Sequence, residues 1–204
     1  MPGSTGFFWI LIAGAVFGSV HSFLASNTAK KGAERIFGVA MRERYRFYYI
    51  LIAIVTTSAY LFLVAALPDA AIYRIPTPWL FFTLAVQIAS LAGAVAAFRE
   101  ISRRFDLSLP FTGSQNPGSS PSQKPELATT GLYRWVRHPI YDCVFIFIWL
   151  FPIMSWNLLA FAIAATAYMI IGAHLEERKL IEQFGASYED YRSRTSMFLP
   201  IRLK

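Results

Sequence analysis

One long apolar stretch limits what this chain can fold into. Residues 140–173 contain no Lys, Arg or Glu, and Asp142 is their only acid. A membrane helix needs about 20 apolar residues, so this stretch is too long for a single crossing. Three residues that favour turns lie near its middle: Pro152, Ser155 and Asn157. The pattern predicts two membrane helices, residues 139–154 and 157–175, joined as a helical hairpin.

Three earlier apolar runs also have the length of a membrane helix. They predict spans at residues 7–25, 47–67 and 79–98. A cleaved signal peptide is the alternative for the first run, but residues 1–6 contain no basic residue and the run is long. Only 15% of the residues are charged, against about 25% in soluble domains. We therefore expect an all-α integral membrane protein with about five transmembrane helices, in which residues 1–204 form a single membrane domain.

The basic residues are distributed unevenly between the loops. A net charge of +7 would favour nucleic acid binding in a soluble chain, but nearly all Lys and Arg lie in residues 27–46, residues 99–130 and the tail 176–204. Basic loops mark the cytoplasmic side of a membrane. Five spans then place the N terminus outside and the C terminus in the cytoplasm, and we expect a bacterial inner membrane. The lipid bilayer, and not nucleic acid, is the expected partner.

Two segments outside the spans have distinct compositions. Residues 110–124 are rich in Pro, Ser, Gly, Gln and Asn, which makes residues 99–130 a mobile cytoplasmic loop, either a linker or a lid over a ligand. The tail carries apolar residues at helical spacing: Leu180, Ile181, Phe184, Tyr188 and Tyr191. This spacing predicts an amphipathic tail on the membrane surface. Cys143 is the only cysteine in the sequence, so no internal disulfide can form.

Small and polar residues of the first span each allow two interpretations. Gly14 and Gly18 form a GxxxG pair, which favours close helix packing within the chain over a homodimer face. His21 lies near the end of this span. A hydrogen bond to a neighbouring residue explains it more simply than a role in substrate binding.

The hairpin predicts which residues meet at the cytoplasmic face. From Pro139 to Trp156 is 17 steps, or about 26 Å of helix, and from Trp156 to Glu176 is 20 steps, or about 30 Å. Both arms are roughly as long as the hydrocarbon core is thick. Glu176 should therefore return to the same membrane face as His138, at a similar depth.

The residues around His138 suit a polar ligand. The residue before a proline disfavours helix and proline suits the first helical position, so the fourth span should begin at Pro139. Free N–H groups in that first turn attract anions, and Arg137 adds positive charge. Tyr133 and Tyr141 offer flat apolar faces with a polar tip. A ligand with a carboxylate and an aromatic base would fit this corner.

The second arm of the hairpin ends in two carboxylates, Glu176 and Glu177. The simplest interpretation is a solvated helix end, with ion pairs to the adjacent Arg178 and Lys179. Their expected position opposite His138 suggests instead that a carboxylate accepts hydrogen bonds from ribose hydroxyls or balances a sulfonium charge. No paired spacing such as HExxH occurs, so we expect no metal.

Taken in order, these motifs resemble a known family. They are Gly131-Leu132-Tyr133, Arg137-His138-Pro139-Ile140-Tyr141, Leu175-Glu176-Glu177-Arg178 and Phe184-Gly185-Ala186-Ser187-Tyr188 with Tyr191. The C-terminal part thereby resembles the isoprenylcysteine carboxyl methyltransferase family, whose superfamily includes phospholipid methyltransferases. The N-terminal part, with His21-Ser22 and Phe105-Asp106-Leu107, is more similar to the bacterial methanethiol S-methyltransferase branch.

The resemblance implies a membrane enzyme that uses S-adenosylmethionine. Matched by position, the residues implied to contact this cofactor are Glu126, Leu127, Tyr133, His138, Pro139, Tyr141 and Glu176. Arg137 and Glu177 lie beside them and join the cofactor-binding candidates. In-line displacement at the sulfonium methyl needs positioning and removal of water more than acid–base groups. A thiol or amine acceptor would need a base, for which His138, His21 and His174 are the candidates.

The methyl acceptor stays open among a small or lipophilic thiol, carboxylate or amine. Two other functions stay open as well. One is an NADPH-dependent membrane reductase, since some sterol-type reductases look similar around the same C-terminal hairpin. The other is a membrane sensor that keeps the fold without chemistry.

Overall fold

The computed structural model describes residues 4–104 and 127–200, without the side chains of residues 43, 103 and 104. Glu126 and the middle of the loop 99–130 lie outside these described residues. The chain divides into two compact units, which are described separately. Unit 1 comprises the described residues 4–73 and 154–168, and unit 2 comprises 74–104, 127–153 and 169–200. The prediction of a single membrane domain stays a prediction.

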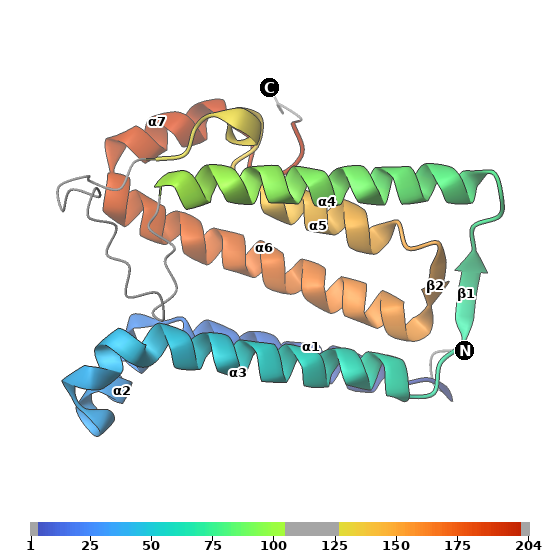
Figure 1. The fold of residues 1–204 in the computed structure, drawn as a ribbon, viewed down its shortest axis with the longest axis horizontal. Coiled ribbons are helices and arrows are strands. Elements are labelled where there is room, and N and C mark those ends of the chain that lie inside the picture. The colour runs from blue at the N-terminus through green and yellow to red at the C-terminus, as the bar shows by residue number, and fades with distance from the viewer. Residues whose placement is uncertain (1–3, 105–126, 201–204) are drawn as a thin grey trace. The chain divides into compact units, whose positions relative to one another are not determined.

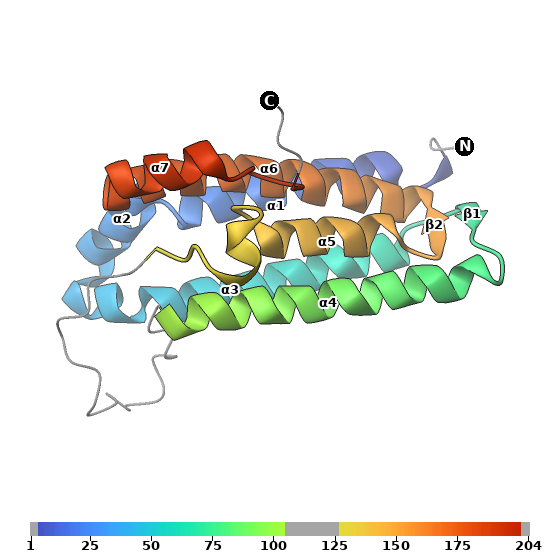
Figure 2. The same cartoon turned by 90° about the horizontal axis from the view of Figure 1, so that it is seen from above.

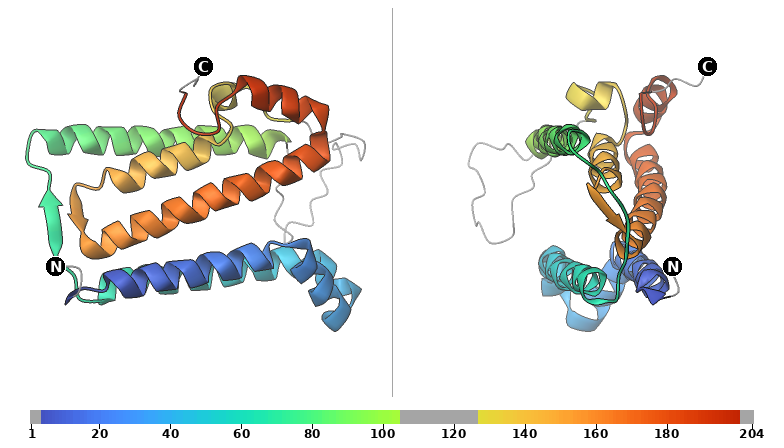
Figure 3. Two further views of the ribbon diagram at one scale, coloured as in Figure 1. Left: turned by 180° about the vertical axis from the view of Figure 1, so that it is seen from behind. Right: turned by 90° about the vertical axis from the view of Figure 1, so that its right-hand side faces the viewer.

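Unit 1 is built on two long helices. Helices α1 (Phe7–Leu24) and α3 (Val39–Ala66) run side by side, and the shorter α2 (Asn27–Phe37) connects them (Figures 1 and 3). The Ser26 side chain accepts a hydrogen bond from the Ala29 N–H at 3.2 Å, which caps the start of α2. Gly38 ends α2 with a φ of 81°, a conformation that glycine adopts without steric cost. The segment 27–46 is therefore helical for most of its length, which its basic composition did not reveal.

The core of unit 1 joins α1 and α3 to the first part of α6 (Trp156–Phe184). Its buried apolar residues are Ile10, Tyr60, Val64 and Ala160. Asn157 is fully buried and its side-chain amide donates to the carbonyls of Val64 and Leu67, at 3.2 and 3.1 Å. These bonds satisfy two carbonyls at the end of α3, which would otherwise stay unpaired inside the core.

The GxxxG pair packs inside this unit. A Cβ on Gly14 would lie 2.6 Å from the Ala164 Cβ and 2.6 Å from the Tyr60 hydroxyl. A Cβ on Gly18 would lie 3.1 Å from the ring of Tyr168. Close packing within the chain, the favoured interpretation of this pair, is confirmed. The chain itself covers the glycine face, and a homodimer through it stays a prediction.

Unit 2 contains α4 (Trp79–Arg104), the 3-10 helix η2 (Gly131–Arg134), α5 (Pro139–Trp149), the second part of α6 and α7 (Ala186–Arg194). Helices α4 and α5 lie side by side (Figure 2). The Gln87 amide donates to the Phe147 carbonyl at 2.9 Å. Gly93 lets α5 approach, since a Cβ there would lie only 3.0 Å from the Cys143 sulfur. This side-chain bond and this close contact hold α5 along α4.

The tip of the predicted hairpin differs from the expectation. Helix α5 ends at Trp149 instead of continuing to residue 154, and residues Ile153–Ser155 form strand β2, which pairs with β1 (Ala71–Arg74). Pro152 has no N–H to continue a helix and disfavours helical backbone at the residue before it. Its carbonyl instead accepts a hydrogen bond from the Ile75 N–H at 2.8 Å. The prediction of a helix over 139–154 was therefore wrong beyond Trp149.

Among the described residues, four helices are long and apolar enough to cross a membrane. They are Phe7–Leu24, Arg44–Ala66, Trp79–Ser102 and Trp156–Phe184. Helix α5 has 11 residues and is about 16 Å long, roughly half the thickness of a hydrocarbon core. Four of the five predicted spans thus have a helix of sufficient length, and the count of five stays a prediction.

Large apolar side chains lie exposed along the long helices. Phe62, Phe81 and Ile88 are 69%, 67% and 70% exposed. In water such surfaces would favour aggregation or a partner, whereas acyl chains cover them at no cost.

The C-terminal tail forms a second, shorter helix after α6. Gly185, with a φ of 54°, separates α6 from α7. Tyr188 and Tyr191 of α7 are 1% and 8% exposed, so they pack against the protein and do not face lipid. The tail is helical as predicted, and its position on the membrane surface stays a prediction.

Candidate active site

His138 stands immediately before the first turn of α5. Its φ of −124° and ψ of 60° are not helical, and Pro139 occupies the first helical position, as the X-Pro sequence predicted. Residues of the tail bind the segment 135–137 that leads to it. The Arg137 N–H donates to the Ser196 carbonyl at 2.9 Å and the His138 N–H to the Met197 carbonyl at 3.2 Å. The backbone on both sides of the histidine is thus held by hydrogen bonds.

The imidazole of His138 is 7% exposed and lies between an aromatic ring and two carboxylates. It stacks on Tyr141, with ring centroids 5.3 Å apart and an interplanar angle of 11°. Its Nδ1 lies 3.8 Å from Glu176 Oε2 and its Nε2 lies 3.4 Å from Glu177 Oε1. The second contact is not aligned as a hydrogen bond, so Nε2 is buried without a hydrogen-bond partner in the described part of the chain. A carboxylate near each nitrogen allows the ring to hold a proton on either one.

Glu176 keeps its carboxylate accessible. Its side chain is 49% exposed, and the Tyr141 hydroxyl donates to Oε2 at 3.2 Å. The predicted return of Glu176 to the depth of His138 is confirmed by the 3.8 Å distance between them. This outcome holds although α5 is shorter than expected, because α6 runs unbroken from Trp156 to Phe184.

Glu177, one residue later, has the opposite environment. Its side chain is 7% exposed and pairs with Arg137, whose Nε donates to Oε1 at 2.5 Å. Arg137 also donates to the backbone carbonyls of Arg192 and Thr195. The guanidinium of Arg137 therefore connects the segment before α5 to α6 and to the end of α7. A buried ion pair whose guanidinium also binds two backbone carbonyls stabilises the structure more than it offers charge to a ligand.

Tyr133, in η2, is buried just before the segment that leads to His138. It is 6% exposed, and its backbone carbonyl accepts a hydrogen bond from the Tyr191 hydroxyl at 2.6 Å. Burial raises the pKa of Tyr191 to about 12 and raises the pKa of Tyr133 as well. Both phenols are therefore neutral at physiological pH, and Tyr191 keeps the proton that it donates.

The structure brings together most of the predicted site residues. Five of them share direct contacts: Arg137, His138, Tyr141, Glu176 and Glu177. Pro139 sets the start of α5, and Leu127 is half-buried. Glu126 lies outside the described residues.

The other two histidines stand elsewhere. His21 belongs to unit 1, where its Nε2 lies 2.8 Å from the Thr56 hydroxyl, which confirms the interpretation that a neighbour satisfies it. His174 is exposed on α6. Within residues 4–104 and 127–200, no group of three His, Cys, Asp or Glu is placed to hold a metal.

Several residues of the corner were not predicted. Phe198 packs on the His138 ring with centroids 5.7 Å apart, and the Leu199 N–H donates to Asp142 Oδ2 at 3.3 Å. Arg192 adds a second cation 3.8 Å from Glu177. The contacts of Phe198 and Leu199 arise because the residues after α7 fold back beside His138, and no local pattern predicts such a return. One sequence signal was available for the ion pair. Arg137 lies just before a predicted membrane span and needs an acidic partner, and Glu177 directly follows Glu176.

Comparison with protein families identifies the chain. The family model of phospholipid methyltransferases matches residues 80–187, which is more than half of the sequence and includes both His138 and Glu176. The chain belongs to the phospholipid methyltransferase family. With four helices able to cross a membrane, this family member is an integral membrane protein, as predicted.

Curated relatives are similar over shorter stretches. A methanethiol S-methyltransferase of Pseudomonas sp. is 41% identical over 80 residues, which is 39% of this chain and 31% of the relative. Methanethiol S-methyltransferase 1 of Bradyrhizobium diazoefficiens is 44% identical over 78 residues, or 38% and 27% of the two chains. That of Mycobacterium tuberculosis is 46% identical over 69 residues, or 34% and 28%. The matched stretch thus spans less than a third of each relative's length, and no solved structure matches the chain significantly.

Proposed function

We propose that this family member transfers a methyl group from S-adenosylmethionine to a small thiol. The observation that supports this most is the pairing of an accessible carboxylate, Glu176, with His138 and Tyr141 at the start of α5. The relatives named as methanethiol S-methyltransferases support a thiol over a carboxylate or an amine. We place the corner on the cytoplasmic side of a bacterial inner membrane, where soluble S-adenosylmethionine is available.

The residues present fit this cofactor. The Glu176 side chain is 49% exposed, so its carboxylate can face a cation or accept hydrogen bonds from hydroxyls. Tyr141 presents a hydroxyl and an aromatic ring, and the first turn of α5 favours a carboxylate. His138 Nε2 is a buried polar atom for which the described residues supply no aligned partner. When bound, S-adenosylmethionine supplies a methyl group on a positively charged sulfur that departs as a neutral thioether.

Each residue then has a defined task. Glu176 holds the donor, and Tyr141 orients Glu176 through its 3.2 Å hydrogen bond. Glu177 and Arg137 keep His138 and the start of α5 in place. The new bond joins the methyl carbon to the acceptor sulfur, whose proton has to leave. His138 accepts that proton, since its nitrogens lie within 3.8 and 3.4 Å of carboxylate oxygens that stabilise the imidazolium.

The test is methyl transfer by the purified protein in detergent. Labelled S-adenosylmethionine is incubated with a small thiol, a prenylated cysteine, a phosphatidylethanolamine and no acceptor. We expect label in the thioether product, and a rate that falls about 10²–10⁴-fold in His138→Asn. Label found only in the prenylcysteine ester or only in the lipid would show that the acceptor is not a small thiol. Binding of NADPH without binding of S-adenosylmethionine would overturn the methyltransferase in favour of the reductase.

A further inference from the structure

A second candidate site lies in unit 1 and is lined by residues that the proposed function does not use. Leu24 at the end of α1, helix α2 and the first turns of α3 surround a cavity of about 660 Å³. The Tyr45 hydroxyl donates to the Leu24 carbonyl at 2.7 Å, which fixes one wall. A cavity of this size is typical of sites that hold a small molecule or a headgroup.

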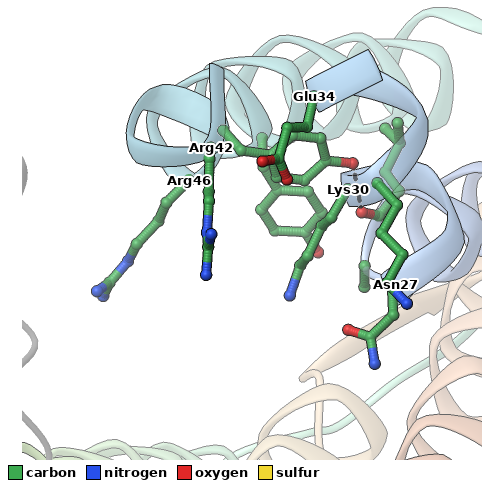
Figure 4. A pocket seen from close by; sticks show the side chains of 10 residues that line it. Asn27, Lys30, Glu34, Arg42 and Arg46 are labelled. Carbon is green, nitrogen blue, oxygen red and sulfur yellow. Dashed lines mark hydrogen bonds between the residues drawn. The ribbon is translucent and has the colours of Figure 1, made fainter. Parts of the chain in front are cut away.

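The charge of this cavity is strongly positive. Four of its lining residues are cations and one is an acid: Lys30, Lys31, Arg42, Arg46 and Glu34. Figure 4 shows Lys30, Arg42 and Arg46 extending toward the same open side of the pocket. Among the described residues, none of the four cations forms a side-chain hydrogen bond or ion pair. Four adjacent cations with a single acid repel one another, and an anion between them removes that repulsion.

The depth of the cavity is set by the spans beside it. The first span ends at Leu24 and the next begins at Arg44. The cavity residues of α1 and α3 therefore lie where the chain leaves the hydrocarbon core. Three large apolar residues at the end of α2 and the start of α3 are also exposed: Ile36, Phe37 and Val39, at 75%, 67% and 71%. Helix α2 thus carries basic residues toward the cavity and exposed apolar residues at its other end. Such a helix lies in the membrane interface, with its apolar residues among acyl chains.

We propose that this cavity binds the phosphodiester headgroup of an anionic phospholipid. The cations of α2 and α3 contact the phosphate, while the exposed apolar residues contact the acyl chains of the same or neighbouring lipids. Basic pockets between membrane helices take lipid headgroups in this way. Topology alone accounts for basic loops on one side of a membrane, but it requires no cavity and no convergence of unpaired cations.

The test compares two pairs of arginines from one basic segment. Arg42→Gln/Arg46→Gln removes two cations that line the cavity. Arg35→Gln/Arg44→Gln removes two exposed cations of the same helices that do not line it, so the net charge is equal. Each protein in neutral detergent with about 0.15 M salt is titrated with phosphatidylglycerol. Charges more than about 8 Å apart are screened there. Bound lipid is counted by native mass spectrometry, and the unfolding temperature is followed in parallel.

We expect phosphatidylglycerol, but not phosphatidylcholine, to bind and to raise the unfolding temperature. The cavity variant should bind about 30-fold more weakly, and the control within about threefold of wild type. Lys30→Gln/Lys31→Gln, on the exposed surface of α2, should reproduce the loss if the arginine variant fails to fold. Equal losses in both arginine variants would overturn the proposal, as would no loss in either. If inorganic phosphate raised the unfolding temperature as much as phosphatidylglycerol does, the ligand would be a soluble anion and the lipid proposal would be overturned.

Discussion

Replacing Glu177 by Gln should destabilise the protein far more than replacing Glu176, although the two residues are neighbours. The Glu177 side chain is 7% exposed and pairs with Arg137, whereas the Glu176 side chain is 49% exposed. Removing one partner of a buried ion pair costs about 3–5 kcal/mol, because the other charge stays buried. Arg137 keeps the carbonyls of Arg192 and Thr195 as acceptors, which puts the expected loss near the lower end, about 3 kcal/mol.

That loss is large enough to measure. For a chain of this length, 1 kcal/mol shifts the unfolding temperature by about 2–4 °C, so Glu177→Gln should lower it by about 6–12 °C. Glu176→Gln loses an exposed hydrogen bond worth less than about 1 kcal/mol and should shift it by at most about 4 °C.

The assay is thermal unfolding in detergent, followed by tryptophan fluorescence. Glu182→Gln, exposed on the same helix, is the control for the loss of one carboxylate. Equal shifts for the Glu176 and Glu177 variants would refute the separation of one ligand-facing and one bracing carboxylate. A shift of less than about 2 °C for Glu177→Gln would refute the brace itself.

Three further predictions concern hydrogen bonding in unit 2 and helix packing in unit 1. Tyr191→Phe leaves the Tyr133 carbonyl without its 2.6 Å hydrogen bond and should cost about 1–3 kcal/mol in thermal unfolding, whereas the same change at the exposed Tyr73 should cost almost nothing. Burial raises the pKa of Tyr191 to about 12 from an unfolded value near 10. The neutral phenol therefore contributes its full stabilisation below about pH 10, and this contribution should fall between about pH 10 and 12. In a pH series of unfolding temperatures, Tyr191→Phe should lose less stability over that range than wild type. Gly14→Ala should destabilise the protein by about 1–3 kcal/mol, because the added Cβ would lie 2.6 Å from both Ala164 and Tyr60. Gly32→Ala, whose Cβ would have nothing within 4 Å, should stabilise it by about 0.5–1 kcal/mol. An equal response of both variants in thermal unfolding would contradict the tight packing of α1.

Sequence reasoning predicted the parts of this structure that depend on local composition. Apolar runs of membrane length located four long helices, and the steps along the hairpin placed Glu176 beside His138. The start of α5 at Pro139 followed from the constraints that proline imposes on itself and on the residue before it.

The parts that depend on distant segments were not predicted. The Arg137 and His138 N–H groups donate to the Ser196 and Met197 carbonyls, which requires the tail to return to the segment before α5. Neither these backbone hydrogen bonds nor the Arg137–Glu177 pair can be read from a local sequence pattern. The early end of α5 was signalled by Pro152, which was interpreted as a turn residue only. Strand pairing with residues 71–74 then completed a tip that composition alone could not specify.

The central claim is that the Glu176 carboxylate holds S-adenosylmethionine beside His138. Isothermal titration calorimetry of the detergent-purified protein with S-adenosylmethionine tests it most directly. We expect wild type and Glu182→Gln to bind alike, and Glu176→Gln to bind about 10- to 100-fold more weakly, the effect of losing a charge-assisted hydrogen bond. Unchanged binding in Glu176→Gln would contradict the claim, and so would a wild-type protein that does not bind S-adenosylmethionine.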